Sequence, residues 1–318
     1  LQEDNVYIAE IDPKSLEIIS EPRQASENSR GRNILPAWAP DGQSIAFIRR
    51  GAVVPRLGLG LGGEADLVIR PVVSSKERIL TRFRWQGAPG DLTWFPDSKS
   101  ILLGEGSPIL HMQVDVDTGK KRIIAKELSP GWNSNIAFSV DGSSLFYTPL
   151  LDSLRDPPVL RLMKRDLASG RDTELYRTES LAYGFFKLAV SPDGSQIAFL
   201  ANGSRSNERF LITVPTNGGS AHELHRGSYN DPLPNSCAWT HDGAHVVIAS
   251  WDSASRTSRF KAIPLAGGDA RPLAISMPNL SDLTVSPDGR RVAFHGGTAS
   301  SEELWMIRNL LPNDDREH

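Results

Sequence analysis

The sequence predicts an all-β fold, a six-bladed β-propeller in which four-stranded antiparallel sheets are arranged around one axis. Three observations support this prediction. A short turn motif recurs six times along the 318 residues. Segments with the composition of β-strands flank each copy, and no segment has the 3.6-residue apolar rhythm of an amphipathic helix.

The turn motif is clearest in SPDGSQIAF at 191–199 and SPDGRRVAF at 286–294, and four further copies are more divergent. Aligning the copies on their shared aspartate gives successive separations of 56, 44, 52, 49 and 46 residues. A four-stranded propeller blade occupies about 40 to 50 residues, so each interval is the length of one blade. The six anchor residues are Asp41, Asp97, Asp141, Asp193, Asp242 and Asp288.

The residues of the motif are those that a tight hairpin turn requires. Proline presets φ at about −65°, aspartate bonds to the backbone two residues later, and glycine adopts the positive φ that closes the hairpin. Three copies depart from the motif, because Ser98 replaces the glycine, and Val140 and His241 replace the proline. We therefore expect the six aspartates to cap turns rather than to supply acid catalysis or a calcium site.

The residues around each turn indicate how the first two strands of a blade are covered. Large side chains stand three positions before each anchor and small ones stand four positions before it, so the two kinds face opposite sides of a strand. After the turn, every copy has three consecutive apolar residues, as in Ile197–Phe199. Such a strand is covered on both faces, and a propeller supplies this cover because each blade lies between two others.

Further strands follow the second strand of five copies, at 66–72 and 78–83, 109–116 and 121–126, 160–167 and 172–177, 209–215 and 221–226, and 259–265 and 270–275. The sixth copy has one such segment, ELWMIRNLL at 303–311, which we expect to be its third strand. The opening segment at 6–26 has strand character and no turn motif. We expect it to pair into the last blade, with one strand or two, and to close residues 1–318 into a single propeller domain.

The composition argues against several classes of function. There are 35 basic and 38 acidic residues, for a net charge of −3, and no cluster of lysine and arginine, so we expect no direct nucleic-acid binding. The single cysteine, Cys237, cannot form an intrachain disulfide. No apolar run approaches the ~20 residues of a membrane helix, so we expect no membrane insertion. The chain begins with Leu1 and has no signal-peptide pattern, so we expect it to be part of a longer product.

The repeated pattern of an aromatic residue, Pro-Asp-Gly and Ile-Ala-Phe resembles the repeats of bacterial TolB-like six-bladed β-propellers, and the likeness covers essentially the whole chain. Strings such as RDLASGRDTEL, IPLAGGDARPL and ELWMIRNLLP are similar to the repeats of TolB-like propellers within larger regulatory or sensory proteins. The resemblance implies a binding or scaffolding module in the periplasm or another extracytoplasmic compartment. It transfers no catalytic residue, because the repeat motif is structural.

Two short motifs have alternative interpretations. GLGLGG at 58–63 matches the dinucleotide-binding pattern but precedes a strand rather than a helix, so we interpret it as a flexible hairpin loop rather than a nucleotide site. The length of this loop would also allow it to act as a lid. HELH at 222–225 places two histidines three apart, and on a strand they point to opposite faces, so we interpret them as surface residues. No serine–histidine–aspartate arrangement is recognisable. We therefore expect no catalytic residue, no metal site and no cofactor.

The candidate binding site is one end of the central channel. In a propeller, the connections between blades and those between second and third strands lie at the same end. Aromatic residues and arginine in these connections are of the types that form binding hot spots, although single aromatics could instead pack between blades. The residues expected to bind a ligand or partner at this channel mouth are Arg30, Arg32, Arg49, Trp85, Trp132, Asn133, Tyr183, Lys187, Tyr229, Asp231, Trp251, Asp252 and Asp282.

Two functions remain open at this stage. The first is a non-catalytic binding propeller, a sensory or scaffolding module of a larger bacterial protein, which as a monomer binds a protein segment or a small molecule. The alternative is a propeller enzyme of the polysaccharide lyase or hydrolase type. It would need carboxylates or a metal at the channel mouth, drawn from Asp152, Asp231, Asp252 and Asp282.

Overall fold

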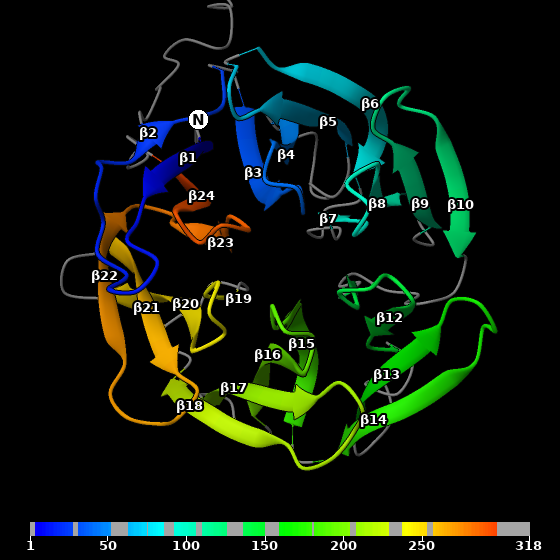
Figure 1. The fold of residues 1–318 in the computed structure, drawn as a ribbon, viewed down its shortest axis with the longest axis vertical. Helices are drawn as coiled ribbons and strands as arrows, with labels where there is room; N and C mark the ends of the chain where they lie inside the picture. Colours follow the sequence, from blue (N-terminus) through cyan, green and yellow to red (C-terminus); the bar gives the residue numbers. More distant parts are fainter. Residues whose placement is uncertain are drawn as a thin grey trace, which may run out of the picture.

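The computed structural model describes residues 4–27, 31–51, 63–74, 76–85, 92–105, 110–125, 136–149, 159–179, 181–203, 208–228, 237–252 and 257–297. Within these ranges the protein consists of β-strands and turns, without a helix. Four-stranded antiparallel sheets follow one another in a ring (Figure 1). The predicted all-β propeller fold is therefore confirmed.

Blades 1 to 3 each contain four consecutive strands. Their bounds are β3 (Gly31–Trp38), β4 (Ser44–Gly51), β5 (Gly63–Pro71) and β6 (Arg78–Trp85); β7 (Leu92–Trp94), β8 (Ser100–Glu105), β9 (Leu110–Asp115) and β10 (Lys121–Ala125); and β11 (Ile136–Phe138), β12 (Ser144–Tyr147), β13 (Leu160–Asp166) and β14 (Asp172–Thr178).

Blades 4 and 5 have the same construction. They contain β15 (Leu181–Val190), β16 (Gln196–Gly203), β17 (Glu208–Pro215) and β18 (His222–Ser228); and β19 (Cys237–Trp239), β20 (His245–Asp252), β21 (Thr257–Pro264) and β22 (Arg271–Met277). The third and fourth strands predicted for all five blades are confirmed. The HELH segment lies on the outer strand β18, where His222 is exposed, as interpreted from the sequence.

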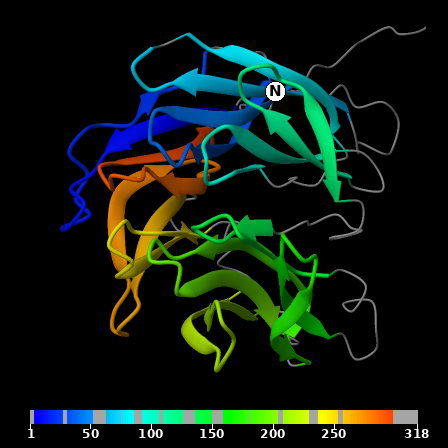
Figure 2. The same ribbon diagram turned by 45° about the vertical axis from the view of Figure 1, so that its right-hand side comes forward.

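The closing blade joins the two parts of the chain that lie farthest apart in sequence. It contains β23 (Ser281–Val285), β24 (Arg291–Gly297), β1 (Asp4–Glu10) and β2 (Arg23–Gln24). A single parallel pair, between Asp4 and Arg32, connects this blade to blade 1 in one hydrogen-bonded sheet. The N-terminal strands lie beside the C-terminal ones in every view (Figure 2). The described strands thus fall into six groups of four.

The N-terminal segment closes the ring, as predicted, but it takes a different place in the blade. Strand β1 pairs with β24 along its whole length, from Asp4 opposite Gly297 to Glu10 opposite Arg291. A strand has two edges, and those of β24 are occupied by β23 and β1. The third place is therefore β1, which corrects the assignment of 303–311 to it; that segment lies outside the described residues. The opening segment supplies two strands, because β2 pairs with β1 at Tyr7 and Ile8.

The core lies between neighbouring blades. The second strand of each blade is apolar at successive positions, and Ala46, Phe47 and Ile48 on β4 are fully buried. One cluster contains Ile48 of blade 1 together with Trp94 of blade 2. Burial of one large apolar side chain contributes roughly 1.5 to 3 kcal/mol, and here each blade needs a neighbour on either side to bury its own. The predicted cover on both faces is confirmed.

Two tryptophans also connect adjacent blades through hydrogen bonds. The indole Nε1 of Trp94 donates to the carbonyl oxygen of Ala37 at 3.0 Å, and that of Trp239 donates to Ala189 at 2.9 Å. In each pair the tryptophan stands three positions before its anchor, and the acceptor stands four positions before the anchor of the preceding blade. At these two positions the repeat places a large apolar group between blades and also satisfies its polar atom, whereas the buried Nε1 of Trp38, at the same position of blade 1, has no hydrogen-bond partner among the described residues.

Each anchor aspartate caps its own turn. In all six copies a carboxylate oxygen accepts a hydrogen bond from the backbone N–H two residues later, at 2.9 to 3.1 Å. A hydroxyl two residues before Asp141, from Ser139, also donates to it at 2.6 Å, and these bonds lower the pKa of Asp141 to about 2. The predicted role of the six aspartates as turn caps is confirmed.

The six turns also contact one another around the axis. A β-carbon added to Gly142 would lie 3.4 Å from the ring of Pro96, and one added to Gly289 would lie 2.6 Å from the β-carbon of His241, where nothing larger than glycine fits. In the same way, the turn glycine of a blade lies close to the residue that precedes the anchor of the neighbouring blade. These further pairs are Gly42 with Pro287, Gly194 with Val140, and Gly243 with Pro192. In the remaining pair, Ser98 stands where the others have glycine, and its Oγ accepts a hydrogen bond from Asp41 N at 3.0 Å.

Two substitutions at Ser98 separate the effect of the contact between turns on stability from the effect of backbone strain. Its φ is +59°, a left-handed conformation that is strained by roughly 1 kcal/mol in a residue other than glycine. Ser98→Ala keeps this strain and loses the hydrogen bond, so we expect its free energy of unfolding in urea to fall by about 1 kcal/mol. Ser98→Gly loses the bond but also the strain, so it should be close to wild type. Equal losses in both variants would contradict this account.

A buried histidine in blade 2 makes the stability of the fold depend on pH. His111 on β9 is 0% exposed, and neither ring nitrogen has a hydrogen-bond partner among the described residues. Burial lowers its pKa from 6.5 to about 4. The unfolded chain therefore binds a proton more readily than the folded one between these values, and the free energy of unfolding decreases as the pH falls from about 6.5 to about 4.

The variant His111→Leu should lose this part of the pH dependence, because no buried imidazole then resists protonation. Urea unfolding at a series of pH values between 7.5 and 4, ~0.5 apart, measures the effect through its slope. His222→Leu, on the exposed side of β18, is the matched control and should retain the wild-type slope. An unchanged slope in His111→Leu would show that other groups are responsible.

Candidate binding site in the central channel

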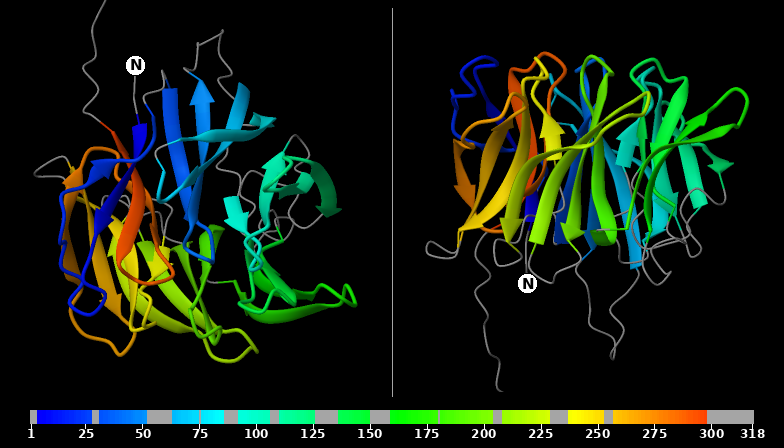
Figure 3. Two further views of the ribbon diagram at one scale, coloured as in Figure 1. Left: turned by 45° about the horizontal axis from the view of Figure 1, so that its top comes forward. Right: turned by 90° about the horizontal axis from the view of Figure 1, so that it is seen from below.

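The blades enclose a cavity along the axis of the ring, with a volume of about 660 Å³. The strands run between the two ends of the ring (Figure 3). We call the end with the six anchor aspartates the turn end, and the other, where the innermost strands begin, the mouth end. Sites for small molecules have volumes of about 300 to 1,000 Å³, so the cavity is of a size to hold a ligand.

The repeat itself determines the lining of this cavity. At the turn end, the residues that precede the anchors form a collar, which consists of Pro40, Pro96, Val140, Pro192, His241 and Pro287. The small residues four positions before the anchors form the wall above it, and those that line the cavity are Thr93, Ala137, Ala189, Ala238 and Thr284. The wall is therefore mostly apolar and consists of side chains too short to fill the channel.

Three innermost strands have the same backbone irregularity toward the mouth end. Leu35, Lys187 and Asp282 each stand six positions before an anchor, and their φ angles are +55°, +41° and +53°. The pairing register shifts at each of these places. Positive φ is unfavourable for residues other than glycine, and such strained residues are concentrated at functional sites.

Near these irregularities, Asp282 is the centre of a buried cluster of polar groups. Its Oδ2 accepts a hydrogen bond from the backbone N–H of Leu35 at 3.3 Å and lies 2.8 Å from Nδ1 of His295 on β24. Burial alone would raise the pKa of Asp282. The charge interaction and hydrogen bond with His295, the charge of Lys187 and the Leu35 N–H outweigh this effect, so the pKa of Asp282 lies below its ordinary value.

A buried ion pair connects the closing blade to blade 1 near the mouth end. Arg32 Nε donates to Oδ2 of Asp4 at 2.5 Å, and the Asp4 side chain is fully buried. The other oxygen of Asp4, Oδ1, has no hydrogen-bond partner among the described residues. Burial, together with the charge of Arg32, lowers the pKa of the neighbouring Arg50. Arg32 thus contributes to ring closure.

A chain of polar side chains extends this joint toward the outside of blade 1. Oδ1 of Asn5 accepts hydrogen bonds from Ser26 Oγ at 3.0 Å and from Nδ2 of Asn33 at 3.1 Å. Arg49 Nε donates to Oδ1 of Asn33 at 3.0 Å, and Arg49 also forms an ion pair with the buried carboxylate of Glu77. Arg49 therefore also contacts residues that hold the two ends of the ring together.

Cys237 borders the channel cavity, but its side chain is buried and it is not a nucleophile. Its side chain is 1% exposed, and its thiol donates to the carbonyl oxygens of Lys187 and Ala198 at 3.5 and 3.8 Å. Burial raises its pKa to about 12. The thiol is therefore protonated at any physiological pH.

We expect Cys237 to be unreactive toward a thiol reagent such as DTNB while the ring is folded. At pH 8 its thiolate fraction is roughly a thousandfold lower than that of an ordinary thiol. One equivalent should react once the chain is unfolded in guanidinium. Rapid stoichiometric labelling of the native protein would show that the strands around β19 open readily.

The structure describes the side chains of five of the thirteen residues predicted at the mouth: Arg32, Arg49, Lys187, Trp251 and Asp282. It brings Lys187 and Asp282 within electrostatic range of each other, and places Arg32 and Arg49 at the joint. Trp251 is half-buried near the mouth end of β20. Only the backbone is described for Trp85, Tyr183 and Asp252, and the remaining residues, Arg30, Trp132, Asn133, Tyr229 and Asp231, lie outside the described ranges.

Sequence reasoning missed His295 and the joint residues Asn5 and Asn33. His295 directly follows the apolar triplet of the last repeat, and a polar residue at that place was its only signal. The GLGLGG segment lies outside the described residues except for Gly63, which begins β5. No cluster of three histidine, cysteine or acidic side chains suited to a metal ion occurs in the ranges that the structure describes. Within the same ranges, no helix could span a membrane.

The architecture defines the protein as a TolB-like β-propeller. A putative TolB from Agrobacterium tumefaciens is similar with a TM-score of 0.67 and 17% sequence identity, and the match covers 94% of this chain and 100% of the other. TolB from Acinetobacter baumannii is similar with a TM-score of 0.60 and 17% identity, over 92% of this chain. This chain spans 64% of the length of that protein.

The likeness extends to a chain of a nidogen/laminin complex, with a TM-score of 0.59 and 10% identity over 84% of this chain and 93% of the other. No family model matches the sequence. No curated protein matches it either. At these identities the similarity concerns the fold, and the function must be argued from the site.

Proposed function

We propose that this chain is a non-catalytic binding module that captures an extended segment of a partner protein, or a small ligand, at the mouth of its channel. The observation that carries the proposal is the cavity of about 660 Å³, which has a mostly apolar wall and is lined by Lys187 toward the mouth end. Such a combination favours binding, because apolar walls supply affinity and a few polar groups orient the ligand. Like the TolB-like repeats that it resembles, the chain would act as a sensory or scaffolding module of a larger bacterial protein, outside the cytoplasm.

The lining explains why an extended segment is the favoured occupant. The wall consists of Ala and Thr at one level around the axis, and the collar below it is mostly proline. These side chains lose little conformational entropy when a ligand binds, so the channel is preorganised. A preformed channel lined by short side chains accepts a chain end more readily than a folded surface.

The bonding of Asp282 favours binding over the enzymatic alternative. An enzyme at the mouth would use its carboxylates as an acid or base, or as metal ligands. Oδ2 of Asp282 instead forms hydrogen bonds with His295 and with the backbone N–H of Leu35 in blade 1, and these interactions keep the pKa of Asp282 low. This carboxylate has a structural role at the joint, and it is not poised to transfer a proton.

Selection of peptides from a phage-displayed library tests the proposal directly. The wild-type chain should enrich a set of related sequences. A bulky side chain in the wall, in Thr284→Trp, should reduce binding of those peptides at least ~tenfold, because it occupies the space that the peptide needs. Fluorescence anisotropy with the enriched peptides gives the dissociation constants.

The control is Thr173→Trp, which makes the same change on the exposed outer strand β14. It should bind the peptides like the wild type. If Thr284→Trp binds them with unchanged affinity, the peptides dock elsewhere and the channel is not the site. If a library enriches nothing, but metal content and turnover of a glycan panel are found, the enzymatic alternative replaces the proposal.

A further inference from the structure

A second pocket lies at the turn end, outside the channel and beside the joint of the ring. Its volume is about 670 Å³. The turn of the closing blade, with Asp288 and Arg290, forms one side, and the segment between β1 and β2 forms the other. The pocket is therefore present only where the N-terminal strands join the ring.

The segment between β1 and β2, residues 11–22, has an ordered structure of its own. Ile11 and Ile18 pair across its base, and Oδ1 of Asp12 accepts hydrogen bonds from the backbone of Lys14 and Ser15 at 2.9 and 2.7 Å. Leu16 is buried in the core cluster that blade 5 shares with the closing blade. The backbone of the segment is thus held by its own hydrogen bonds and by the burial of Leu16.

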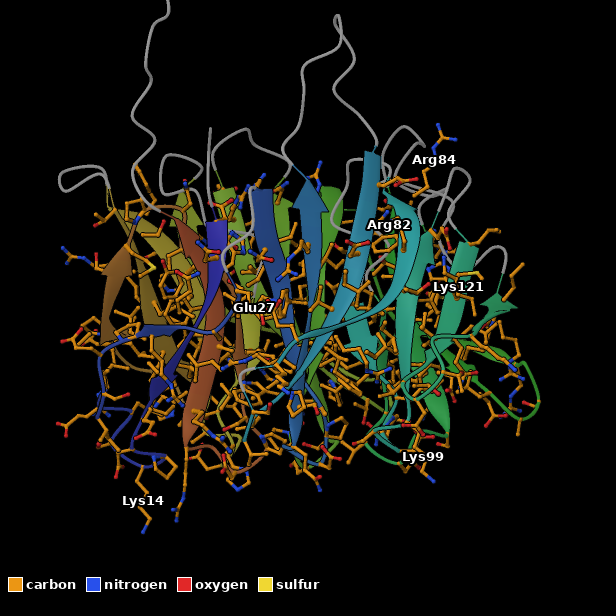
Figure 4. All side chains as sticks on the ribbon, turned by 90° about the horizontal axis from the view of Figure 1, so that it is seen from above. Lys14, Glu27, Arg82, Arg84, Lys99 and Lys121 are labelled. Carbon is orange, nitrogen blue, oxygen red and sulfur yellow. The ribbon has the colours of Figure 1, made fainter. Side chains whose placement is uncertain are left out.

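Four cations from three elements surround this pocket: Lys14, Arg23, Arg290 and Arg291. Arg291 lies over the ring of Trp38, 5.2 Å from its centroid, and 3.5 Å from a carboxylate oxygen of Asp288. In the described part of the chain, the other three are exposed and form no ion pair. Figure 4 shows Lys14 at this end of the molecule, opposite the end that carries Arg84.

Four cations and three carboxylates, those of Glu10, Asp12 and Asp288, line the pocket, so the cations exceed the carboxylates by one. Asp12 accepts hydrogen bonds from its own turn. Asp288 accepts them from the Ser286 hydroxyl at 2.5 Å and from the backbone of Arg290 at 3.1 Å. These bonds hold both carboxylates at their own turns, and among the described residues Lys14, Arg23 and Arg290 have no carboxylate within ion-pair distance.

Comparison of the six turns within the chain shows that the arginines are not required by the fold. Position two after the anchor holds Arg290 here, and Gln43, Lys99, Ser143, Ser195 and Ala244 in the other copies. Position three holds Arg291 here, and Ser44, Ser100, Ser144, Gln196 and His245 elsewhere. Both positions tolerate small or neutral residues in the same turn geometry. The adjacent pair of arginines therefore needs a reason other than turn formation.

We propose that this turn-end pocket binds a compact anionic small molecule, one that carries phosphate or carboxylate groups next to an apolar part. The guanidinium groups of Arg23 and Arg290 offer paired donors that match the paired oxygens of either group. Ile19, whose side chain is 64% exposed, and Pro13 line the same pocket and would contact the apolar part. The site lies at the opposite end from the channel mouth, so it goes beyond the proposed function.

Isothermal titration calorimetry on the whole chain at low ionic strength tests this site, with inorganic pyrophosphate and citrate titrated separately. At least one of them should bind with a dissociation constant below about 1 mM. In the variant Arg23→Gln/Arg290→Gln, the dissociation constant should rise at least ~tenfold. Binding of pyrophosphate alone assigns the phosphate chemistry, and binding of citrate alone assigns the carboxylate chemistry.

The matched control is Lys99→Gln, which removes the cation at the equivalent position of the blade 2 turn, at the same end of the ring (Figure 4). It should change the affinity less than about twofold. The proposal is overturned if neither anion binds, if the double variant binds like the wild type, or if Lys99→Gln weakens binding equally. Peptide selection at the channel is independent of these results, so failure of one site leaves the other intact.

Discussion

The structure depends on the burial of sheets that are apolar on both faces. A single blade such as β15–β18 cannot bury both of its faces by itself, so each blade is stable only between two neighbours. An open row of such blades would leave an apolar face uncovered at each end. Closure into a ring removes both uncovered faces at once, and here the pairing of β1 with β24 accomplishes it.

The joint of the ring differs from the other interfaces in its chemistry. The other contacts between blades are mainly apolar, and apolar burial is not directional. At the joint, Asp4 pairs with Arg32, and Asn5 and Asn33 bond to each other within a buried chain of polar groups. A buried polar group left without its partner is unfavourable, so these bonds disfavour a slipped register of β1. The register, in turn, places residues of both candidate sites, because Asp282 lies on β23 and Arg290 lies in the turn between β23 and β24, in the blade that β1 completes.

The repeat determines different features at the two ends of the ring. At the turn end, all six copies retain the same aspartate cap, and the collar follows from the residue before each anchor. The proposed anion site at that end therefore lies where the closing blade departs from the repeat, at Arg290 and Arg291. Toward the mouth end, the repeat fixes the bulge at Leu35, Lys187 and Asp282, while the side chains there differ from blade to blade. A shared backbone with variable side chains is suited to recognition.

The sequence alone determined the all-β repeat, the turn caps and the double cover of the second strands, because these follow from local turn chemistry and from residue spacing within one repeat. Only the tertiary structure decided that β1 takes the third place in the closing blade. It also showed that Arg32 and Arg49 form ion pairs at the joint, and that Asp282 meets His295. The physical reason is that these contacts form between different strands and loops. Ring closure pairs Asp4 with Gly297 and brings Leu35 to Asp282, and periodicity along the chain carries no information about which side chains of separate elements meet.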